Sequence, residues 1–371
     1  MTVLPPAMTM TSIQPEQYQA QLDTKVAKFK NALSNLPCDV STMDIFTSPD
    51  SHYRMRAEFK VWHDGDIARY AMHDQATKKP IFLDTFPVAC ERINILMPKI
   101  MQRINENELL RKKLFQIEFL STTTGDTLVS FIYHKPLDEA WISAIASLKD
   151  TFNIQIVGRS RKQKLVLDRD YVNETLTVNR RPFHYRQYEG SFTQPNAAVC
   201  EKMLSWAVNQ TLESSGDLLE LYCGNGNFTL PLSQNFHQVI ATEISKASVN
   251  AAHYNLEHNA VNNVTLVRMS SEDFADAMDK VRPFRRLKDI DLESYTFSTV
   301  FVDPPRAGLD DHTLEIIQRF NQILYISCNP DTLVHNLETL CKTHEIKQLA
   351  AFDQFPYTEH LEAGVLLQRK A

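Results

Sequence analysis

The stretch ELYCGNGNFTL, residues 220–230, is the most informative about the fold of this 371-residue chain. It follows an apolar run and places Gly224 and Gly226 where a strand is expected to end. Glycine lets the backbone approach a ligand more closely than a residue with a Cβ allows. The spacing is GxG without the third glycine of the dinucleotide fingerprint, so a ligand without a pyrophosphate suits this loop better than NAD. The motif alone is weak evidence for any ligand.

Strand-like and helical stretches alternate along the rest of this half. The expected strands are 217–223, 238–244, 263–269, 297–304 and 322–328, and the expected helices are 228–235, 245–258, 271–281, 311–320 and 331–342. This rhythm predicts an α/β fold with a parallel sheet covered on both faces. Two final strand-like stretches, 346–355 and 362–369, have no helix between them and predict an antiparallel ending. That ending is typical of a Rossmann-like, seven-stranded S-adenosylmethionine (SAM)-dependent methyltransferase sheet rather than a nicotinamide-binding one.

Acidic residues stand where ligands of open α/β sheets bind, beyond the carboxyl ends of the strands. Glu243 ends the second strand, where a carboxylate can accept hydrogen bonds from ribose hydroxyls. The alternative is a charge that complements a helix N-terminus. Asp303 begins DPPRAGL (303–309), a rigid extended turn at a place where nucleic-acid methyltransferases hold the target base. Arg306, in place of an aromatic residue, argues against methylation of an exocyclic amine.

Cys328 follows the fifth strand in LYISCNPDTL (324–333). Asn329 fits the cap of a following helix, whose N-terminus is expected to lower the pKa of the thiol. A free cysteine is more commonly a buried packing residue, but this position favours a nucleophile.

Three further titratable groups lie between the last two strands, in FPYTEHLEAG (355–364). They are Glu359, His360 and Glu362. A carboxylate near the cysteine can act as a general base, and spacing alone does not choose among the three.

The first half predicts a mixed α+β module. Residues 16–33 have the apolar spacing of a helix, and 115–134 reads as a hairpin with its turn near Gly125. Residues 53–62 alternate as a strand that presents Arg54 and Arg56 on one face. Such a face can rest on a phosphate backbone, and a solvated sheet face is the alternative.

A basic segment follows the helix expected at 137–150 and the strand expected at 152–158. Residues 159–186 carry eight Lys and Arg against three acids, with Arg159, Arg161, Lys162 and Lys164 at its start. The interleaved aromatic residues are Tyr171, Phe183 and Tyr185. Because bases can stack on such rings while cations contact phosphates, this segment predicts an RNA-binding face.

Charge and cysteine content limit the function classes. Residues 1–190 carry 25 Lys and Arg against 22 Asp and Glu, and residues 191–371 carry 14 against 23. This asymmetry predicts that one half holds a polyanion, with chance surface variation as the alternative. The cysteines are too far apart for a zinc or iron–sulfur site, so no metal is predicted. No apolar run reaches the roughly 20 residues of a membrane span, and residues 1–10 lack a signal peptide pattern. We therefore expect a cytoplasmic protein without a membrane partner.

Taken together, these segments resemble the RNA uracil-C5 methyltransferase family, and most closely its tRNA branch, which makes 5-methyluridine at position 54 of the T arm. The similar segments are EGSFTQPN (189–196), LLELYCGNGNFTLPL (218–232), FVDPPRAGL (301–309), ISCNP (326–330) and FPYTEHLEAGVLL (355–367). They cover most of the second half and are jointly specific. The absence of clustered cysteines favours the tRNA branch over the related ribosomal-RNA enzymes.

The resemblance implies roles for individual residues. It makes Cys328 the nucleophile that adds to uracil C6 and Glu362 the base that removes the C5 proton. The implied SAM-binding residues are Gln194, Tyr222, Asn227, Glu243 and Asp303, beside Gly224 and Gly226. Arg306 is a candidate for stabilising charge on O4. Phe192 can stack near the site, although a core position is the simpler prediction.

The domain organisation and the competing functions follow. We expect an RNA-recognition region at 1–190 and a catalytic domain at 191–371, acting as a monomer on the tRNA T arm, with T-arm-like RNAs such as tmRNA as further candidates. The alternatives are a ribosomal-RNA uridine-C5 methyltransferase, a nicotinamide-dependent oxidoreductase and a non-catalytic RNA-binding protein.

Overall fold

The computed structural model describes residues 13–74 and 79–371, so the prediction for residues 1–10 lies outside the described residues. The chain packs into two compact units. Beyond the N-terminal residues, the first unit contains Pro49–Thr175 and Arg186–Ala197, and the second contains Glu16–Ser48, Leu176–Tyr185 and Ala198–Ala371. The units therefore interleave in sequence, whereas the border predicted at residue 190 is a single cut.

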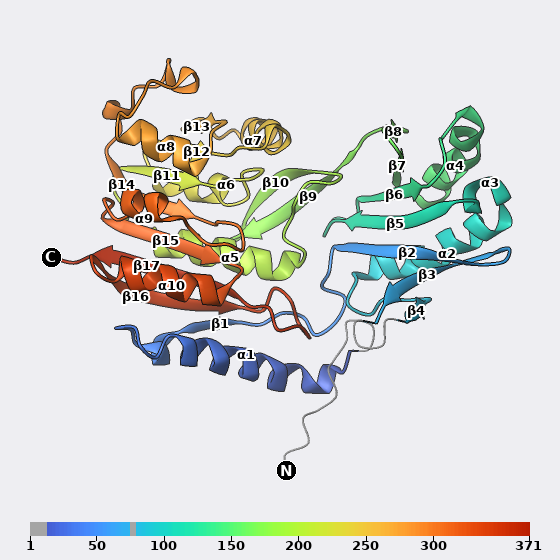
Figure 1. Ribbon diagram of the computed structural model, residues 1–371, viewed down its shortest axis with the longest axis horizontal. Coiled ribbons are helices and arrows are strands. Elements are labelled where there is room, and N and C mark those ends of the chain that lie inside the picture. The colour runs from blue at the N-terminus through green and yellow to red at the C-terminus, as the bar shows by residue number, and fades with distance from the viewer. Residues whose placement is uncertain (1–12, 75–78) are drawn as a thin grey trace, which may run out of the picture. The chain divides into compact units, whose positions relative to one another are not determined.

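Helices and strands occupy most of the described chain (Figure 1). The helices are α1 (Tyr18–Ala32), α2 (Glu91–Glu106), α3 (Glu108–Arg111), α4 (Glu139–Phe152), α5 (Ala197–Gln210), α6 (Thr229–Leu232), α7 (Lys246–His258), α8 (Ser271–Met278), α9 (Asp311–Ile317) and α10 (Pro330–Leu340). The strands are β1 (Asp44–Phe46), β2 (Arg56–Asp64), β3 (Ile67–His73), β4 (Pro80–Leu83), β5 (Leu114–Ser121), β6 (Thr127–Tyr133), β7 (Gln155–Ser160), β8 (Gln163–Val166), β9 (Tyr171–Val178), β10 (Arg181–Tyr188), β11 (Asp217–Leu221), β12 (Val239–Thr242), β13 (Val264–Val267), β14 (Phe297–Val302), β15 (Gln322–Ser327), β16 (His344–Phe352) and β17 (Glu362–Arg369). Every element predicted from the sequence is present, with its ends shifted by a few residues.

The second unit is built on an eight-stranded sheet in the order β1-β16-β17-β15-β14-β11-β12-β13. Strand β17 runs antiparallel to both of its neighbours, β15 and β16, and the remaining pairs are parallel. The prediction of an α/β sheet with an antiparallel last strand is confirmed. The sequence did not predict β1, because three residues are too few for a periodic pattern.

The central strands are apolar because both faces of the sheet are covered. All residues of β11 and β12 are buried, as are the last four of β14 and the last five of β15. In Figure 1, α9 and α10 lie in front of this sheet. Parallel strands linked by helices in this way present their carboxyl ends along one edge. The loops at that edge carry Gly224, Glu243, Asp303 and Cys328.

The first unit has a seven-stranded sheet in the order β4-β3-β2-β5-β6-β7-β8. Its pairs are antiparallel except β6 with β7, which α4 connects, so the predicted α+β organisation is confirmed. Strand β2 alternates as expected, with Ala57, Phe59 and Val61 buried.

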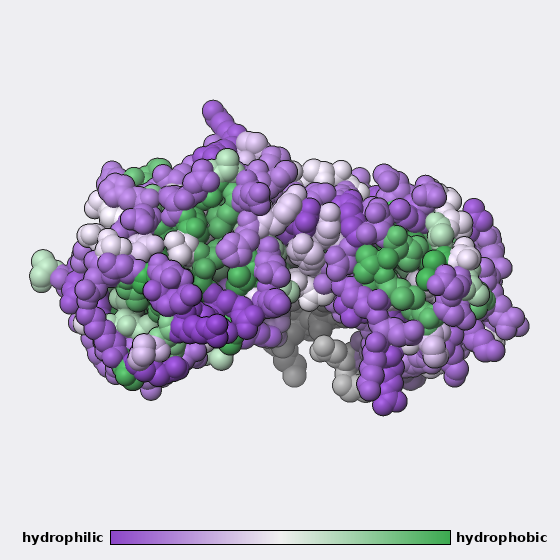
Figure 2. Space-filling view, turned by 90° about the horizontal axis from the view of Figure 1, so that it is seen from above, coloured by the Kyte–Doolittle hydropathy of each residue, from purple (hydrophilic) through white to green (hydrophobic). Residues whose placement is uncertain are grey.

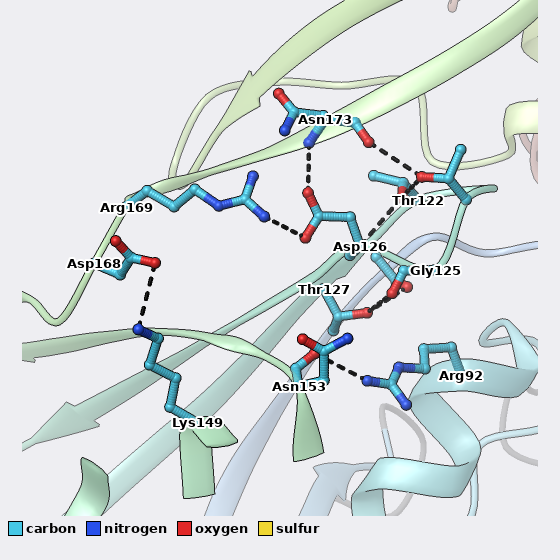
Figure 3. A network of polar contacts seen from close by, with 12 residues as sticks. Arg92, Thr122, Gly125, Asp126, Thr127, Lys149, Asn153, Asp168, Arg169 and Asn173 are labelled. Carbon is cyan, nitrogen blue, oxygen red and sulfur yellow. Dashed lines mark hydrogen bonds and ion pairs between the residues drawn. The ribbon is translucent and has the colours of Figure 1, made fainter. Parts of the chain in front are cut away.

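Polar contacts hold the β5–β6 turn in the first unit (Figure 3). Asp126 accepts hydrogen bonds from Arg169 NH2 and from Asn173 N, both at 2.8 Å. Gly125 has a φ of 84°, which the turn requires and which glycine adopts without strain. One carboxylate therefore fixes the turn to the segment that enters β9.

Hydrophilic residues cover most of the surface seen in Figure 2, and hydrophobic residues show through in separate patches. Within residues 13–74 and 79–371, no helix combines the length and the apolar character needed to cross a membrane.

Candidate active site

The loop after β14 brings an acid and a cation to the carboxyl edge of the sheet. Asp303 follows Val302 directly, and burial raises the pKa of its carboxyl group to about 7. Arg306 is exposed three residues later. Its backbone oxygen accepts hydrogen bonds from Asn329 Nδ2 at 3.0 Å and from Thr332 Oγ1 at 3.3 Å. These bonds tie the loop after β14 to the start of α10.

Cys328 lies between the end of β15 and the first turn of α10, as the sequence predicted. The Asn329 side chain caps the helix by accepting a hydrogen bond from Asp331 N at 3.2 Å. Pro330 occupies the first turn, where its missing N–H costs nothing. The thiol is therefore half-buried at a strand end and next to a helix N-terminus.

The predicted lowering of the thiol pKa is wrong for the free protein. Burial, the largest cause, raises the pKa of Cys328 to about 11, because the thiolate loses hydration. The carboxyl groups of Glu362 and Asp303 raise it further, and only the Arg306 cation and a backbone hydrogen bond oppose them. The helix N-terminus does not outweigh desolvation and two nearby acids.

Glu362 faces this cysteine across an antiparallel pair of strands. Ser327 of β15 pairs with Ala363 of β17, so one further step along the ladder places Cys328 opposite Glu362. The Glu362 side chain is only 2 % exposed, and its Oε2 has no hydrogen-bond partner among the described residues. Burial, with a smaller effect of Asp303, raises the pKa of this carboxyl group well above its ordinary value.

The structure shows that Glu359, His360 and Glu362, among which sequence spacing did not choose a general base, have different environments. Glu359 is exposed, whereas Glu362 is buried beside the thiol. Arg306 NH2 donates to His360 Nδ1 at 3.4 Å. Because a guanidinium only donates, Nδ1 must accept, which places the ring proton of the neutral imidazole on Nε2. Burial, and then the Arg306 charge, lowers the pKa of His360 and favours this neutral form.

A cavity of about 210 Å³ opens beside Cys328. Its lining residues are Lys25, Lys28, Phe29, Ala32, Arg306, Cys328, Asn329, Pro330, Asp331, Glu359, His360 and Leu361. Four of these belong to α1, and none is among the residues predicted to bind SAM. The sequence did not associate α1 with the site, because Lys25 is 303 positions from Cys328 and no local pattern links them.

The glycine loop after β11 adopts left-handed backbone conformations. Gly224 and Gly226 have φ values of 56° and 83°, and a Cβ at Gly226 would lie 3.0 Å from Leu230 Cδ1. Tyr222 also has a positive φ, 63°, which is strained for a residue with a side chain. Its hydroxyl lies 2.5 Å from Ser271 Oγ at the start of α8. The loop is therefore held in one defined shape at the carboxyl end of β11.

Glu243 and Asn227 complete this side of the sheet edge. Glu243 accepts backbone hydrogen bonds from Gly224 N at 3.1 Å and Ser245 N at 2.7 Å, one to each carboxylate oxygen. It therefore joins the glycine loop to the start of α7 and keeps lone pairs free for a ligand. The Asn227 backbone oxygen accepts a hydrogen bond from Tyr185 OH at 3.0 Å.

Gln194, the remaining predicted cofactor ligand, belongs to the first unit. Its Oε1 is buried and has no hydrogen-bond partner among the described residues. Phe192, for which a core position was the simpler prediction, is instead 75 % exposed. A short loop with no hydrophobic periodicity gave no basis for choosing between these environments.

Three of the six predicted RNA-binding cations surround one carboxylate of the first unit. Arg159 donates to both oxygens of the buried Glu189 at 2.5 Å, and Lys164 lies 3.3 Å from the same group. Arg56 and Glu189 line the same small cavity, and Arg56 NH2 donates to Ser191 O at 2.7 Å. Sequence spacing did not indicate that this glutamate matches much of their charge.

The other three cations differ from these. Arg54 is half-buried, and its Nε donates to Arg56 O at 2.8 Å. Arg161 and Lys162 form the exposed turn between β7 and β8, and no ion pair joins either to another described residue. The turn residues are therefore the most accessible of the six.

Two of the predicted stacking residues are unsuited to that role. Phe183 and Tyr185 are buried in the core, so their faces do not meet solvent. Tyr171 is half-buried, and the Arg186 guanidinium lies over its ring, 3.8 Å from the centroid. The error arises because an alternating strand buries every second residue, which composition alone does not resolve.

Glu220 is a further buried acid that the sequence analysis did not single out. It lies in β11, is 1 % exposed, and its Oε2 has no hydrogen-bond partner among the described residues. Burial, with a smaller contribution from Asp303, raises the pKa of Glu220 to about 8. The signal was present in the sequence as a lone acid inside an apolar run.

A family model described as tRNA (Uracil-5-)-methyltransferase matches residues 17–370. This chain belongs to that family. The finding confirms the resemblance drawn from the motifs at 218–232 and 326–330, and it covers the first half of the chain as well.

Sequence relatives support the same assignment. The chain is 57 % identical over 358 residues to the tRNA/tmRNA (uracil-C(5))-methyltransferase of Saccharophagus degradans, covering 96 % of this chain and 98 % of that protein. It is 53 % identical over 371 residues to the protein of the same name from Vibrio vulnificus, covering 98 % and 100 %. The two proteins therefore align with this family member nearly end to end.

A solved structure shares the fold. The Pyrococcus abyssi tRNA (uracil-54, C5)-methyltransferase, determined in complex with S-adenosyl-L-homocysteine, superimposes with a TM-score of 0.72 at 20 % identity. The match covers 99 % of this chain and 88 % of that chain. The predicted α/β methyltransferase fold of this family member is confirmed.

Proposed function

We propose that this protein transfers a methyl group from SAM to C5 of uridine 54 in the T arm of tRNA, and that tmRNA is a further substrate. Family membership and the names of the relatives support the reaction and the RNA class. The observation that carries the mechanism is the placement of Cys328 opposite Glu362, beside a cavity that lies apart from the glycine loop.

The cofactor side fits SAM. A glycine loop without the third glycine suits a ligand that has no pyrophosphate, and Glu243 offers carboxylate lone pairs at the end of β12. We propose that Glu243 holds the ribose and that Tyr222, Asn227 and Asp303 contact the remaining parts. Gln194 is a further SAM ligand implied by the resemblance, and its buried Oε1 has no hydrogen-bond partner among the described residues. When bound, SAM supplies an electrophilic methyl group.

Cys328 activates the uracil in this account. Uracil C5 is a poor nucleophile, and addition of a thiolate to C6 moves electron density to C5 and O4. C5 can then form the new bond to the methyl group. Because the thiol pKa is about 11 in the free protein, the thiolate must form at the moment of use, and the adjacent Arg306 favours that form. Donation to O4 would lower the barrier, and Arg306 is our candidate.

Glu362 completes the reaction as the base. The methylated adduct carries one proton on C5, and its removal lets the C5–C6 double bond re-form as the sulfur leaves. A desolvated carboxylate with a raised pKa is a strong acceptor for that proton. One proton is released to solvent per methyl transferred, and the cysteine returns unchanged.

RNA recognition is assigned to the first half of the chain. We propose that residues 1–190 hold the T arm, with Arg161 and Lys162 as the most accessible phosphate contacts. Arg159 and Lys164 would act together with Glu189, and Arg54 and Arg56 would be further cations of this face. The target uridine must leave its stack to reach Cys328. Because the substrate is tRNA, we place the protein in the cytoplasm, and because one chain carries both Cys328 and Glu362, a monomer suffices.

A tRNA transcript tritiated at uracil C5 tests this function. With SAM, the wild-type protein is expected to release tritium and to incorporate one methyl group per tRNA. Methyl transfer without tritium release would place the methyl elsewhere and refute C5 chemistry. If wild type reacts only with ribosomal RNA transcripts, the tRNA assignment is wrong.

A further inference from the structure

We infer that helix α1 forms a wall of the pocket that receives the flipped uridine, and that Lys28 binds a backbone phosphate beside that nucleotide. The inference rests on the proposed function and adds to it a phosphate-binding residue far from the RNA-recognition segments identified by sequence. Lys28 lines the same cavity as Cys328 and Arg306, although 300 positions separate it from the cysteine.

Helix α1 is fixed to the loop that leads into β17. Lys25 Nζ lies 2.7 Å from Asp353 Oδ1 and donates to Phe355 O at 2.8 Å. Gln21 Nε2 donates to Asp353 Oδ2 at 2.8 Å, and Gln21 Oε1 accepts from Tyr357 N at 3.3 Å. Both members of the ion pair are buried, so the position of this helix against the loop is built into the fold.

Lys28, one turn further along α1 than Lys25, forms no ion pair with another described residue. Lys25 and Lys28 are three residues apart and share a helix face. Asp353 matches the charge of Lys25, whereas Lys28 is exposed and no ion pair or hydrogen bond joins it to another described residue. A lysine without a carboxylate partner, on the rim of a cavity, is suited to an anion that arrives from outside.

The chemistry of the substrate supplies that anion. Flipping a nucleotide brings its two flanking phosphates toward the mouth of the pocket. Asp331 and Glu359 also line the cavity, so cations at the mouth must offset repulsion between these acids and the RNA backbone. Arg306 is held toward His360 and lies beside the thiol, and Lys25 is paired with Asp353, which leaves Lys28 as the remaining cation among the lining residues.

Salt-dependent binding tests the role of Lys28. We compare Lys28→Met with Lys30→Met, since Lys30 lies on the same helix but does not line the cavity. Binding of tRNA to the full-length protein with S-adenosylhomocysteine is measured between about 50 and 200 mM salt. For Lys28→Met, the slope of log K against log salt is expected to fall by about 1, and KM for tRNA to rise roughly fivefold. Lys30→Met should match wild type, and Lys28→Arg should keep the wild-type slope.

Several results would overturn the inference. The inference fails if the slope of log K against log salt is unchanged in Lys28→Met, or if Lys30→Met reduces it equally. Lys28 would then contribute at most to the general electrostatic attraction between the protein and RNA. Weaker binding of S-adenosylhomocysteine or a lower Tm in Lys28→Met would make its role structural. The binding slope needs no turnover, so a failure of Lys28 is distinguishable from a failure of the proposed reaction, which methyl incorporation by wild type reports.

A second variant tests the wall itself. Ala32 lines the cavity from α1, and Ala32→Phe adds bulk to the uridine side without touching the glycine loop. Methylation of tRNA is expected to fall at least tenfold while binding of S-adenosylhomocysteine and the Tm stay at wild-type values. Full activity of this variant would contradict a uridine pocket bounded by α1.

Discussion

Two carboxylates at the same edge of the sheet are held in opposite ways. Glu243, on the glycine-loop side, accepts a backbone hydrogen bond at each oxygen. Glu362, on the cysteine side, is buried, and its Oε2 has no hydrogen-bond partner in the part of the chain that the structure describes. Burial raises the pKa of this carboxyl group well above its ordinary value. A group that binds a ligand gains from being oriented in advance, whereas a group that must take a proton gains from poor solvation. In the proposed function, Glu243 therefore lies on the side that binds SAM and Glu362 on the side that reacts.

The largest effect is expected from removing the proposed nucleophile. Cys328→Ala should lower methyl transfer by more than about 10⁴-fold, because uracil then has no route to an activated C5. Binding of S-adenosylhomocysteine, measured by calorimetry, should stay within the error of wild type. Loss of S-adenosylhomocysteine binding would instead make Cys328 a structural residue. It would also contradict the division into a cofactor-binding side and a reacting side. Cys341→Ala, which alters a buried cysteine away from the cavity, is the matched control.

The corresponding variant on the glycine-loop side is Glu243→Gln. It retains one carbonyl oxygen but loses the charge, so S-adenosylhomocysteine should bind about tenfold more weakly or worse. Alkylation of Cys328 at fixed pH should not change, since Glu243 is not among the groups that shift the thiol pKa. An unchanged affinity for S-adenosylhomocysteine would contradict the role of Glu243 as a cofactor ligand.

The reactivity of the Cys328 thiol tests the cysteine side of the comparison. In wild type, the alkylation rate of Cys328, followed by peptide mass spectrometry, should titrate near pH 11. Glu362→Gln removes a negative charge that disfavours the thiolate, so the midpoint should move to lower pH and the rate at pH 9 should rise several-fold. A midpoint that stays or moves upward would show that the two groups are not coupled.

A smaller effect is expected from Glu220, the buried acid of β11. Its pKa is raised from 4.5 to about 8, so the folded protein binds more protons than the unfolded chain between these values. Stability due to neutral Glu220 is therefore complete below pH 4.5 and falls as the pH rises toward 8. Glu220→Gln should raise the Tm by about 3 °C or more at pH 8.5 and by less at pH 5. Exposed Glu257→Gln is the control, and an equal change at both pH values would contradict the assignment.

Sequence reasoning succeeded where the signal was local. The apolar period and the turn residues predicted the strands that end just before Glu243, Asp303 and Cys328. The parallel sheet followed from the alternation of these strands with helices. The cap at Asn329 was likewise correct, because capping depends on neighbouring residues only.

It failed where distant segments decide the environment. The thiol pKa depends on Glu362, which reaches Cys328 only because β17 inserts beside β15. The cations near Glu189 looked free in the sequence but pair with it in the fold. Burial and pairing across hundreds of positions leave no periodic trace, and the same is true of α1 beside the cavity.

The most direct test of the central claim is trapping of the methylated adduct with Glu362→Gln. After incubation with tRNA and SAM, the variant is expected to run on a denaturing gel as a protein–RNA complex, with the methyl group in the RNA and the C5 proton retained. The double variant with Cys328→Ala should give no such complex. Rapid release of fully methylated tRNA by Glu362→Gln, with no adduct, would contradict the account.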